Sequence, residues 1–381
     1  MTVIVSDDFA ELRHQMVDRL VAGGAITDSR WEAAFRAVPR HLFAPAAYHV
    51  TPGSGQVGRL LRADNPADLD AYATVVYADD AVVTQVTADG QATSSSTQPT
   101  VMAHMLEALR VDDGMRVLEV GTGTGYNAAL LCHRLGDERV TSVDIDPWLV
   151  AHAKAALATV GYHPTVVAGD GLTGVPDRAP YHRVIATCST PRVPPAWLEQ
   201  TAAGGVIVAN LGFGVIPLRV AADGTAWGRF HPTMAAFIRA RPATGPTAPT
   251  SQEILDRCLY EQAVETAAGG ELAAVDDPEF EFVCSVCLPG VYWCAIDLRQ
   301  DENRYVHCFA DNAGSWARAT LPNWVVAQGG PRRLWDEVAA LWLRWAYLGR
   351  PSHERLGLTI GPAGEHIVWA DEPDRELTRL V

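Results

Sequence analysis

Apolar residues between about 111 and 222 alternate between short continuous runs and helical spacing. This alternation of strand and helix is typical of a parallel α/β sheet. Asp146-Pro147 supplies an N-cap and a proline at the first helical position, which predicts a helix start. A turn at Asp223-Gly224 predicts a hairpin that closes the sheet as an antiparallel edge. The expected strands are Met115–Val120, Arg139–Asp144, Thr165–Ala168, His182–Thr187 and Gly205–Leu211, and the helices begin near Tyr126, Pro147 and Pro195.

The first 110 residues have a different pattern, which predicts a helical lead-in followed by loops. Ser29-Arg-Trp-Glu32 fits a capping box, and Trp31, Phe35 and Val38 then form an apolar stripe. Residues 51–70 and 84–100 are rich in Gly, Thr, Ser, Asp and Pro, so we expect loops that could cover a site.

After a Pro- and Thr-rich stretch at 241–250, which predicts a linker, the pattern changes to hairpins and one strong helix. Turn signals occur at Pro289-Gly290, at 311–314 and at 361–364. The helix is expected to begin at Pro331 and to end at Gly349. Its apolar face would consist of Leu334, Trp335, Val338, Leu341, Trp342 and Trp345. This region, 251–381, is therefore expected to be a smaller α+β domain.

Composition narrows the possible functions. The formal net charge of −15 argues against a nucleic-acid partner, because neutralising phosphates requires clustered Lys and Arg. No stretch approaches the roughly 18 uncharged apolar residues that span a bilayer, and the N-terminus does not resemble a signal peptide. Seven Cys, an odd number, fit reduced thiols. We therefore expect a cytoplasmic protein with no nucleic-acid or membrane partner.

The most informative motif is Gly121-Thr-Gly-Thr-Gly125, which follows one expected strand and opens one expected helix. Glycines let a backbone turn sharply and approach a ligand closely, and a helix N-terminus favours anions. The spacing differs from the G-x-G-x-x-G of dinucleotide enzymes, and Glu119 precedes the loop. That carboxylate would repel a pyrophosphate but would suit the ammonium group of a methionine moiety.

Two further acids follow the next strands. Asp144 could accept hydrogen bonds from ribose hydroxyls, and Asp170, in Gly169-Asp170-Gly171, could accept from an adenine amino group. These acids could instead be N-caps beside a tight turn, but three acids at successive strand ends favour S-adenosylmethionine. The expected cofactor-binding residues are Gln98, Glu119, Gly121, Thr122, Gly123, Thr124, Gly125, Tyr126, Asp144, Ile145, Gly169, Asp170 and Gly171.

The chain resembles the protein-L-isoaspartate O-methyltransferases over roughly residues 9–215. The resemblance rests on the cofactor motifs above, on Val38-Pro-Arg-His-Leu-Phe-Ala-Pro45, on Thr97-Gln-Pro99 followed by Met102-Ala103, and on Ala179-Pro-Tyr181 with Gly204-Gly205. It implies a Rossmann-like class I methyltransferase sheet. It also implies a hydroxyl before Pro99 that contacts the substrate carboxylate.

The chain departs from that family in three places. Thr97 stands where the family usually has Ser, His182 stands where Asp is common, and about 150 residues follow the catalytic unit. Thr97 and the extension resemble a subfamily associated with ribosomal peptide natural products. The resemblance implies methylation of an aspartyl side chain in a modified peptide, followed by cyclisation to aspartimide and hydrolysis to isoaspartate. The alternative is repair-type methylation of isoaspartate in damaged proteins.

Methyl transfer to a carboxylate needs no general base, because a carboxyl of ordinary pKa is ionised at neutral pH. Positioning and removal of water then supply most of the catalysis. We expect Thr97, with Ser96 or Ser95, to hold the acceptor carboxylate, although the Ser-rich run could be only a flexible loop. A non-catalytic peptide-binding protein and a small-molecule methyltransferase fit the intact motifs less well.

Other residues are of types that bind metals or act in catalysis. Cys284, Cys287, Cys294, His307 and Cys308 could suggest zinc, but the flanking residues favour buried strands of a hairpin, so we expect no metal. Cys188 is expected in the pocket wall rather than as a nucleophile. Most Trp residues after 222 should be core, with Trp316 or Trp324 possible in a peptide groove.

The expected organisation follows from these patterns. Residues 1–240 would form the catalytic domain, with a lead-in over 1–110 and the cofactor-binding core over 111–240. Residues 241–250 would link it to a substrate-selection domain over 251–381. We expect a monomer that acts on a peptide or protein presenting Asp or isoaspartate.

Overall fold

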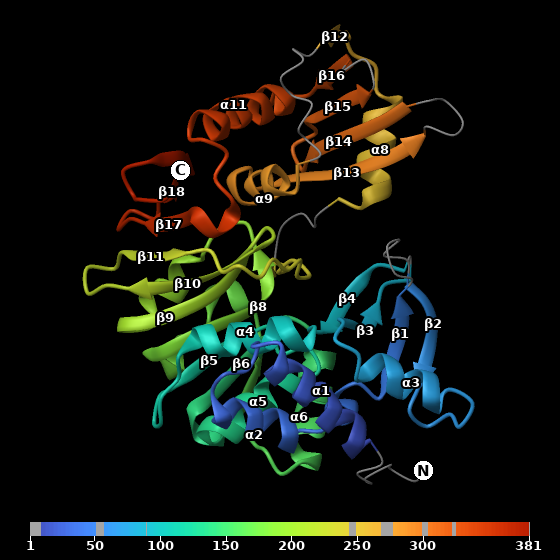
Figure 1. The fold of residues 1–381 in the computed structure, drawn as a ribbon, viewed down its shortest axis with the longest axis vertical. Helices are drawn as coiled ribbons and strands as arrows, with labels where there is room; N and C mark the ends of the chain where they lie inside the picture. Colours follow the sequence, from blue (N-terminus) through green and yellow to red (C-terminus); the bar gives the residue numbers. More distant parts are fainter. Residues whose placement is uncertain are drawn as a thin grey trace.

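The computed structural model describes residues 9–50, 57–88, 90–243, 249–267, 277–298, 304–321 and 325–380. These residues form a ten-stranded sheet, a four-stranded sheet and a five-stranded sheet (Figure 1). The α/β fold class expected from the sequence is confirmed: a mixed sheet with parallel and antiparallel strands, together with a β-rich C-terminal region.

The central sheet has the strand order β19-β18-β17-β11-β10-β9-β8-β5-β6-β7. Its parallel part matches the five strands expected from the apolar runs. The chain first adds β6 and β7 on one side of β5 and then returns to place β8 on the other side. This reversal is a topological switch point, where open α/β sheets bind ligands. The parallel strands are β5 (Val117–Val120), β6 (Val140–Asp144), β7 (Thr165–Ala168), β8 (Tyr181–Thr190) and β9 (Thr201–Leu211).

Helices from the lead-in and from the βα units cover this sheet. They are α1 (Ala10–Ala22), α2 (Ser29–Ala37), α4 (Pro99–Leu109), α5 (Tyr126–Leu135), α6 (Pro147–Thr159) and α7 (Pro195–Glu199), with 3₁₀ turns η1 (Arg40–Phe43), η2 (Asp137–Arg139), η3 (Gly171–Thr173) and η4 (Pro176–Arg178). Trp31, Phe35 and Val38 are buried, as their stripe predicts. The cap of α2 is different from the one expected. Asp28, not Ser29, accepts from the Arg30 N–H at 2.9 Å, while Glu32 bonds Arg36.

The two segments expected as loops contain regular structure. Within them lie most of a four-stranded antiparallel sheet and the starts of two helices, at Leu69 and Pro99. Residues Val82–Val86 have the β-branched composition of a strand, and the Ser-rich run pairs beside them, so a polar composition concealed a strand. The elements are β1 (Ala46–Val50), β2 (Val57–Arg62), α3 (Leu69–Val76), β3 (Val82–Val86) and β4 (Ala92–Ser96), in the sheet order β2-β1-β3-β4.

The hairpin at Asp223-Gly224 is present, with Gly224 at a φ of 83°. It joins β10 (Gly214–Val220) to β11 (Ala226–Arg229), but it is not the edge of the sheet. The final strands of the chain continue the sheet beyond β11, through β17 (Leu356–Ile360), β18 (His366–Ala370) and β19 (Glu376–Leu380). Residues on both sides of the expected linker thus share one sheet, and the division into domains stays a prediction. Residues 244–248 of the linker lie outside the described residues.

The five-stranded sheet has the order β12-β16-β15-β14-β13 and lies at the far end of the molecule in Figure 1. Its strands are β12 (Thr266–Ala267), β13 (Val291–Leu298), β14 (Arg304–Asp311), β15 (Trp316–Leu321) and β16 (Val325–Gly329). Two of the described helices pack against it, α8 (Ser251–Tyr260) and α11 (Leu334–Tyr347). Helix α9 (Pro278–Cys287) packs against α11, and the 3₁₀ turn η6 (His353–Arg355) packs against α9. All six expected apolar residues of α11 are buried, and the helix starts three residues after Pro331.

Two expectations for this region need correction. Cys284 and Cys287 belong to helix α9 rather than to hairpin strands, because Asp277 caps a helix that Pro278 begins. Trp316 is buried at 1% exposure and cannot form a peptide groove, while Trp324 lies outside the described residues. Among the described helices, none is long and apolar enough to cross a membrane.

Candidate active site

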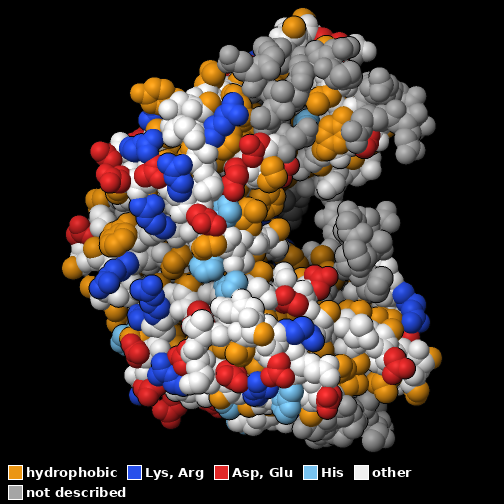
Figure 2. Space-filling view, viewed as in Figure 1, with side chains coloured by type: hydrophobic (Ala, Val, Ile, Leu, Met, Phe, Trp, Pro, Cys, Tyr) orange, Lys and Arg blue, Asp and Glu red, His pale blue; other side chains and the backbone are white. Residues whose placement is uncertain are grey.

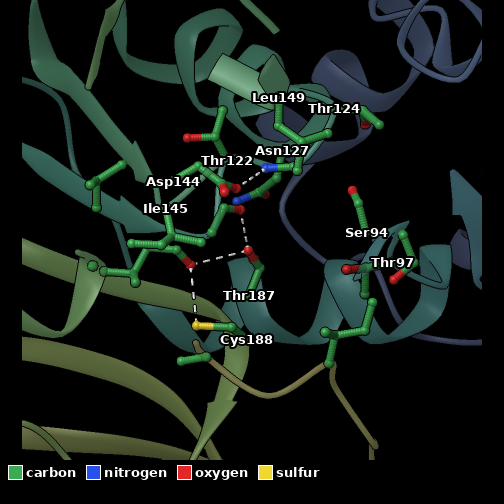
Figure 3. A pocket seen from close by; sticks show the side chains of 18 of the residues that line it. Ser94, Thr97, Thr122, Thr124, Asn127, Asp144, Ile145, Leu149, Thr187 and Cys188 are labelled. Carbon is green, nitrogen blue, oxygen red and sulfur yellow. Dashed lines mark hydrogen bonds between the residues drawn. The ribbon is translucent and has the colours of Figure 1, made fainter. Parts of the chain in front are cut away.

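A cavity lies at the carboxyl ends of the parallel strands, at the switch point. Loops after β5, β6 and β7 form one side of it, and the end of β4 forms the opposite side. In Figure 3, Ser94 and Thr97 lie across the cavity from Asp144, Ile145 and Cys188. The segment Ile238–Arg241 completes the lining. On one face of the molecule, a hollow separates the four-stranded and five-stranded sheets (Figure 2).

The glycine loop after β5 is held close to β8. Gly121 has a φ of 95°, and a Cβ placed there would lie 2.8 Å from Thr187 Oγ1. Thr187 donates to the Gly121 carbonyl at 2.6 Å, which fixes the start of the loop. Both the positive φ and the close approach therefore require glycine at this position.

Asp144, at the end of β6, is 8% exposed and lines the cavity. Its Oδ2 accepts from the Gly123 N–H at 2.8 Å, and its Oδ1 accepts from the Asp146 N–H at 3.0 Å. Each carboxylate oxygen has two lone pairs, so both can accept a further bond from a ribose hydroxyl. Asp144 thus ties the glycine loop to the second strand and presents acceptors to the cavity.

Asp170 lines the cavity from the end of β7. Its Oδ1 accepts from the Leu172 N–H at 2.9 Å, and its Oδ2 accepts from the Ala243 N–H at 3.0 Å. The carboxylate therefore caps η3 and also anchors the segment that follows Ile238. Apolar side chains of Ile145 and Leu172 line the same end of the cavity, an environment that suits an adenine ring.

Glu119 is fully buried, and its side chain lies behind the cavity wall. It accepts from Asn127 Nδ2 at 2.7 Å and from the Ser142 hydroxyl. Burial, with a smaller effect of the nearby Asp144 charge, raises its pKa to about 7, although the two hydrogen bonds act in the opposite direction. The direct contact that the sequence suggested between Glu119 and an ammonium group does not fit this placement.

Asn127 takes the position that Glu119 was expected to hold. Its side chain lines the cavity, its Nδ2 is fixed by Glu119, and its buried Oδ1 has no hydrogen-bond partner among the residues that the structure describes. A buried acceptor left unpaired costs free energy until a donor arrives. An ammonium group in the cavity would supply that donor, so the residues present fit S-adenosylmethionine.

The structure brings most of the predicted site residues together and leaves a few outside. Gln98 bonds Asp79 at 3.4 Å, and Gly125 caps α5. The Gly169 N–H donates to the Asp144 carbonyl at 2.9 Å. With Glu119, these three do not line the cavity. The predicted residues that do line it are Ser95, Ser96, Thr97, Gly121, Thr122, Gly123, Thr124, Tyr126, Asp144, Ile145, Asp170 and Gly171.

The acceptor side of the cavity is built on Arg40, from the Val-Pro-Arg-His motif. This guanidinium is fully buried and donates to the carbonyls of Ser96 and Thr97, at 3.2 and 2.9 Å. It also donates to the carbonyls of Val76, Ala78 and Asp80 and to Ser96 Oγ. Arg40 therefore fixes the backbone at the end of β4, and no sequence signal had assigned it that role.

The hydroxyls on this side differ in availability. Ser96 is buried and its Oγ is used by Arg40, and Ser94 Oγ accepts from Thr84 at 3.1 Å. The Thr97 hydroxyl has no hydrogen-bond partner among the described residues, and neither has that of Ser95. Thr97 and Ser95 are therefore better placed than Ser96 to meet a ligand.

Sequence reasoning placed Cys188 in the pocket wall, and it lines the cavity. Burial raises the pKa of its thiol to about 12, so it stays protonated at neutral pH and is a poor nucleophile. The cavity is also lined by Asn127, Thr187 and the Ile238–Arg241 segment, which the sequence patterns did not identify as site residues. Over the described ranges, no group of three or more His, Cys, Asp or Glu side chains is arranged to hold a metal ion.

Comparisons with known proteins agree with this geometry. Residues 62–217 match the family described as protein-L-isoaspartate(D-aspartate) O-methyltransferase. A protein-L-isoaspartate O-methyltransferase of Ignicoccus hospitalis is 32% identical over 200 residues, covering 52% of this chain and 81% of the relative. One of a Synechococcus species is 35% identical over 208 residues, covering 54% and 72%.

Similar structures extend the likeness in fold beyond the matched residues. A solved structure named protein-L-isoaspartate O-methyltransferase covers 94% of this chain and 100% of its own, with a TM-score of 0.56 and 21% identity. The fold of the C-terminal region is thus not peculiar to this chain. From the sequence relatives and the cavity together, the chain belongs to the protein-L-isoaspartate O-methyltransferase family and is an S-adenosylmethionine-dependent methyltransferase.

Proposed function

We propose that this enzyme methylates the free α-carboxylate of isoaspartyl residues in peptides or proteins. The observation that carries the proposal is the free Thr97 hydroxyl across the cavity from Asp144, on a backbone that Arg40 holds rigid. The family's sequence relatives support isoaspartate as the acceptor. The oligomeric state and the compartment stay predictions.

The cofactor-binding roles are part of the proposal. Asp144 would hold the ribose, Asp170 and the apolar wall beside it the adenine, and Asn127 Oδ1 the ammonium group. Glu119 would act through Asn127 by fixing its amide. Bound S-adenosylmethionine supplies a methyl group activated by its sulfonium.

The protein's own part is to position the acceptor. Thr97 Oγ–H donates to one carboxylate oxygen, and the other oxygen gains the methyl group to form the ester. No proton has to be removed, because the carboxylate is already ionised at neutral pH. The cavity walls keep water from the reacting groups, which strengthens the hydrogen bond that orients the acceptor.

The second candidate function is methylation of an aspartyl side chain, which the resemblance in sequence implied. It predicts methylation of an Asp side chain in a modified peptide, followed by ring closure to aspartimide with loss of methanol. The substitution of Thr97 for the family's Ser favours it, because an added methyl group changes the space beside the acceptor. The C-terminal region favours it less, since a protein of the isoaspartyl family has a similar fold over nearly the same length.

Mass spectrometry on two peptides that differ only in Asp or isoaspartyl linkage tests the proposal. The enzyme with S-adenosylmethionine should add one methyl group to the isoaspartyl peptide and leave the Asp peptide unchanged. Methylation of the Asp peptide followed by loss of methanol, with the isoaspartyl peptide untouched, would refute the proposal in favour of the second candidate. An Asp144→Ala enzyme serves as the cofactor-binding control.

A further inference from the structure

The cavity has an uneven distribution of charge. Its acidic lining residues, Asp144 and Asp170, belong to the half that suits the nucleoside, and hydroxyls line the acceptor half. The cationic side chains in the lining are Arg239 and Arg241, both on the Ile238–Arg241 segment. An anionic acceptor therefore meets positive charge only along that segment of the lining.

The segment is fixed to the cofactor-binding sheet. The Ser189 N–H donates to the Ile238 carbonyl at 3.0 Å, and the Ala240 N–H donates to the Ser189 carbonyl at 2.8 Å. These bonds form a parallel bridge between Ser189 and Arg239, directly after Cys188 in β8. Further along, the Ala243 N–H is held by Asp170. The backbone at Arg239 is thus anchored on both sides.

The two arginines have different surroundings. Burial raises the pKa of Asp146, but the hydrogen bond from Gln85 and, to a smaller extent, the charge of Arg241 lower it, so Arg241 lies near Asp146 on the nucleoside side. Arg239 is exposed, and its guanidinium carbon lies 4.1 Å from the ring centroid of Tyr292 in β13. No ion pair joins Arg239 to an acidic side chain within the described residues.

A guanidinium packed on an aromatic face keeps its N–H edges available for an anion, while the ring restricts its orientation. Tyr292 belongs to the five-stranded sheet, which begins after the sequence-matched region ends. The contact therefore connects the C-terminal region to the cavity where the acceptor must bind.

We propose that Arg239 is an acceptor-binding residue that pairs with the carboxylate of the substrate peptide, and that Tyr292 is its positioning residue. This inference rests on the proposed function, because it takes the acceptor to be a carboxylate. An exposed ion pair between Arg239 and the substrate should stabilise the bound substrate and the transition state to a similar extent. Its removal should therefore raise KM and leave kcat nearly unchanged.

Steady-state kinetics of the full chain with an isoaspartyl peptide tests the assignment of Arg239. Arg239→Gln should raise the peptide KM about tenfold, the effect of losing one charge-assisted hydrogen bond, with kcat nearly unchanged. Arg239→Lys should recover part of the loss. Added salt should raise the wild-type KM but not that of Arg239→Gln. The cofactor Kd, measured by calorimetry, should be the same in all of these proteins.

Tyr292 is tested by a pair of variants. Tyr292→Leu should raise KM about threefold, as expected for an exposed cation–π contact, and Tyr292→Phe should restore it because the ring remains. Arg229→Gln is the matched control, since Arg229 stacks on Trp369 at 4.9 Å and does not line the cavity. Its KM should equal that of the wild type.

The outcomes separate this inference from the proposed function. If the wild type methylates the isoaspartyl peptide but Arg239→Gln has an unchanged KM, the assignment of Arg239 is overturned and the proposed function stands. If KM rises equally in Arg239→Gln and Arg229→Gln, the contact is not specific and the inference also fails. If the wild type does not methylate the isoaspartyl peptide, the proposed function itself fails.

Discussion

Thr97 and Asp144 lie on opposite sides of the cavity, and each also makes hydrogen bonds that hold the surrounding structure in place. The Thr97 carbonyl is held by Arg40, and the Asp144 carboxylate holds the Gly123 amide and the Asp146 amide. At the scale of single residues, side chains for binding are thus positioned by main-chain bonds of their neighbours. Substitutions here should be read with isosteric controls, so that loss of a contact is distinguished from loss of structure.

Replacing Thr97 by Val removes the hydroxyl and keeps the branched shape. Because the hydroxyl has no partner among the described residues, stability should change little. We expect kcat/KM for the isoaspartyl peptide to fall at least tenfold, as for loss of one hydrogen bond to a charged group. Thr97→Ser should keep activity within a few fold of wild type. Equal kcat/KM in Thr97→Val and wild type would remove Thr97 from the acceptor site.

Glu119 predicts a pH dependence of stability. Burial raises its pKa in the folded protein to about 7, above the unfolded value of 4.5, so the folded state binds more protons between these values. Its contribution to stability is present below pH 4.5 and is lost as the pH rises through 7. The loss could reach about 3 kcal/mol, by the conversion of pKa difference to free energy.

Glu119→Gln provides the comparison, because the amide can still bond Asn127 and Ser142 but does not titrate. Urea unfolding at pH 5 and pH 8 should show a larger loss of stability in the wild type than in Glu119→Gln. If the two proteins lose equal stability over this interval, Glu119 does not titrate as described.

At the scale of elements, Arg40 connects η1 with the end of β4 and the loop after α3. Its guanidinium bonds carbonyls of Val76, Ala78, Asp80, Ser96 and Thr97. Burial lowers its pKa, but arginine stays charged, so these bonds are charge-assisted. The motif that contains Arg40 therefore acts as a scaffold for the acceptor side of the cavity.

Arg40→Met should leave those buried carbonyls without donors. Breaking a buried polar network typically costs about 3–5 kcal/mol, so we expect a large loss in urea unfolding. Arg30→Gln is the control, because Arg30 is half exposed and its surface ion pair with Asp28 should contribute little to stability. Equal stabilities of the two variants would contradict the scaffold role.

The parallel part of the fold was predictable, and the acceptor side was less so. Val117–Val120, Val140–Asp144 and the loops after them combine apolar runs with glycines and acids, signals that are local in the sequence. The strand Ala92–Ser96 lacks such a signal, because Ser and Thr favour loops until a neighbouring strand pairs with them. Asn127 and Ser142 donate hydrogen bonds to the Glu119 carboxylate and hold it away from the cavity. These bonds depend on side-chain packing, which the spacing of residues in the sequence does not predict.

At the scale of the whole molecule, the last strands of the chain join the ten-stranded sheet that holds the cavity. Strands β17, β18 and β19 extend the sheet beyond β11, and one apolar core runs from the catalytic sheet through α9 and α11. Gly212 lies so close to Ser285 of α9 that a Cβ would approach its carbonyl oxygen to 2.4 Å. Pairing between strands so distant in sequence was not visible in local patterns.

Truncation after residue 243 tests this integration. Removing the C-terminal part would expose the β11 edge and the apolar faces that α9 and β17 now cover. Exposed edges and large apolar patches promote aggregation, so the fragment should be insoluble or should unfold without a cooperative transition. A soluble fragment with a sharp melting transition and normal cofactor affinity would show instead that residues 1–243 form an independent unit.

The central claim is that the cavity between Asp144 and Thr97 transfers a methyl group to an isoaspartyl carboxylate. The most direct measurement is the rate of methyl-ester formation on matched isoaspartyl and Asp peptides, using the wild-type chain and S-adenosylmethionine. We expect ester formation on the isoaspartyl peptide at a kcat/KM far above that on the Asp peptide. A kcat/KM that is equal for the two peptides, or higher for the Asp peptide, would contradict it.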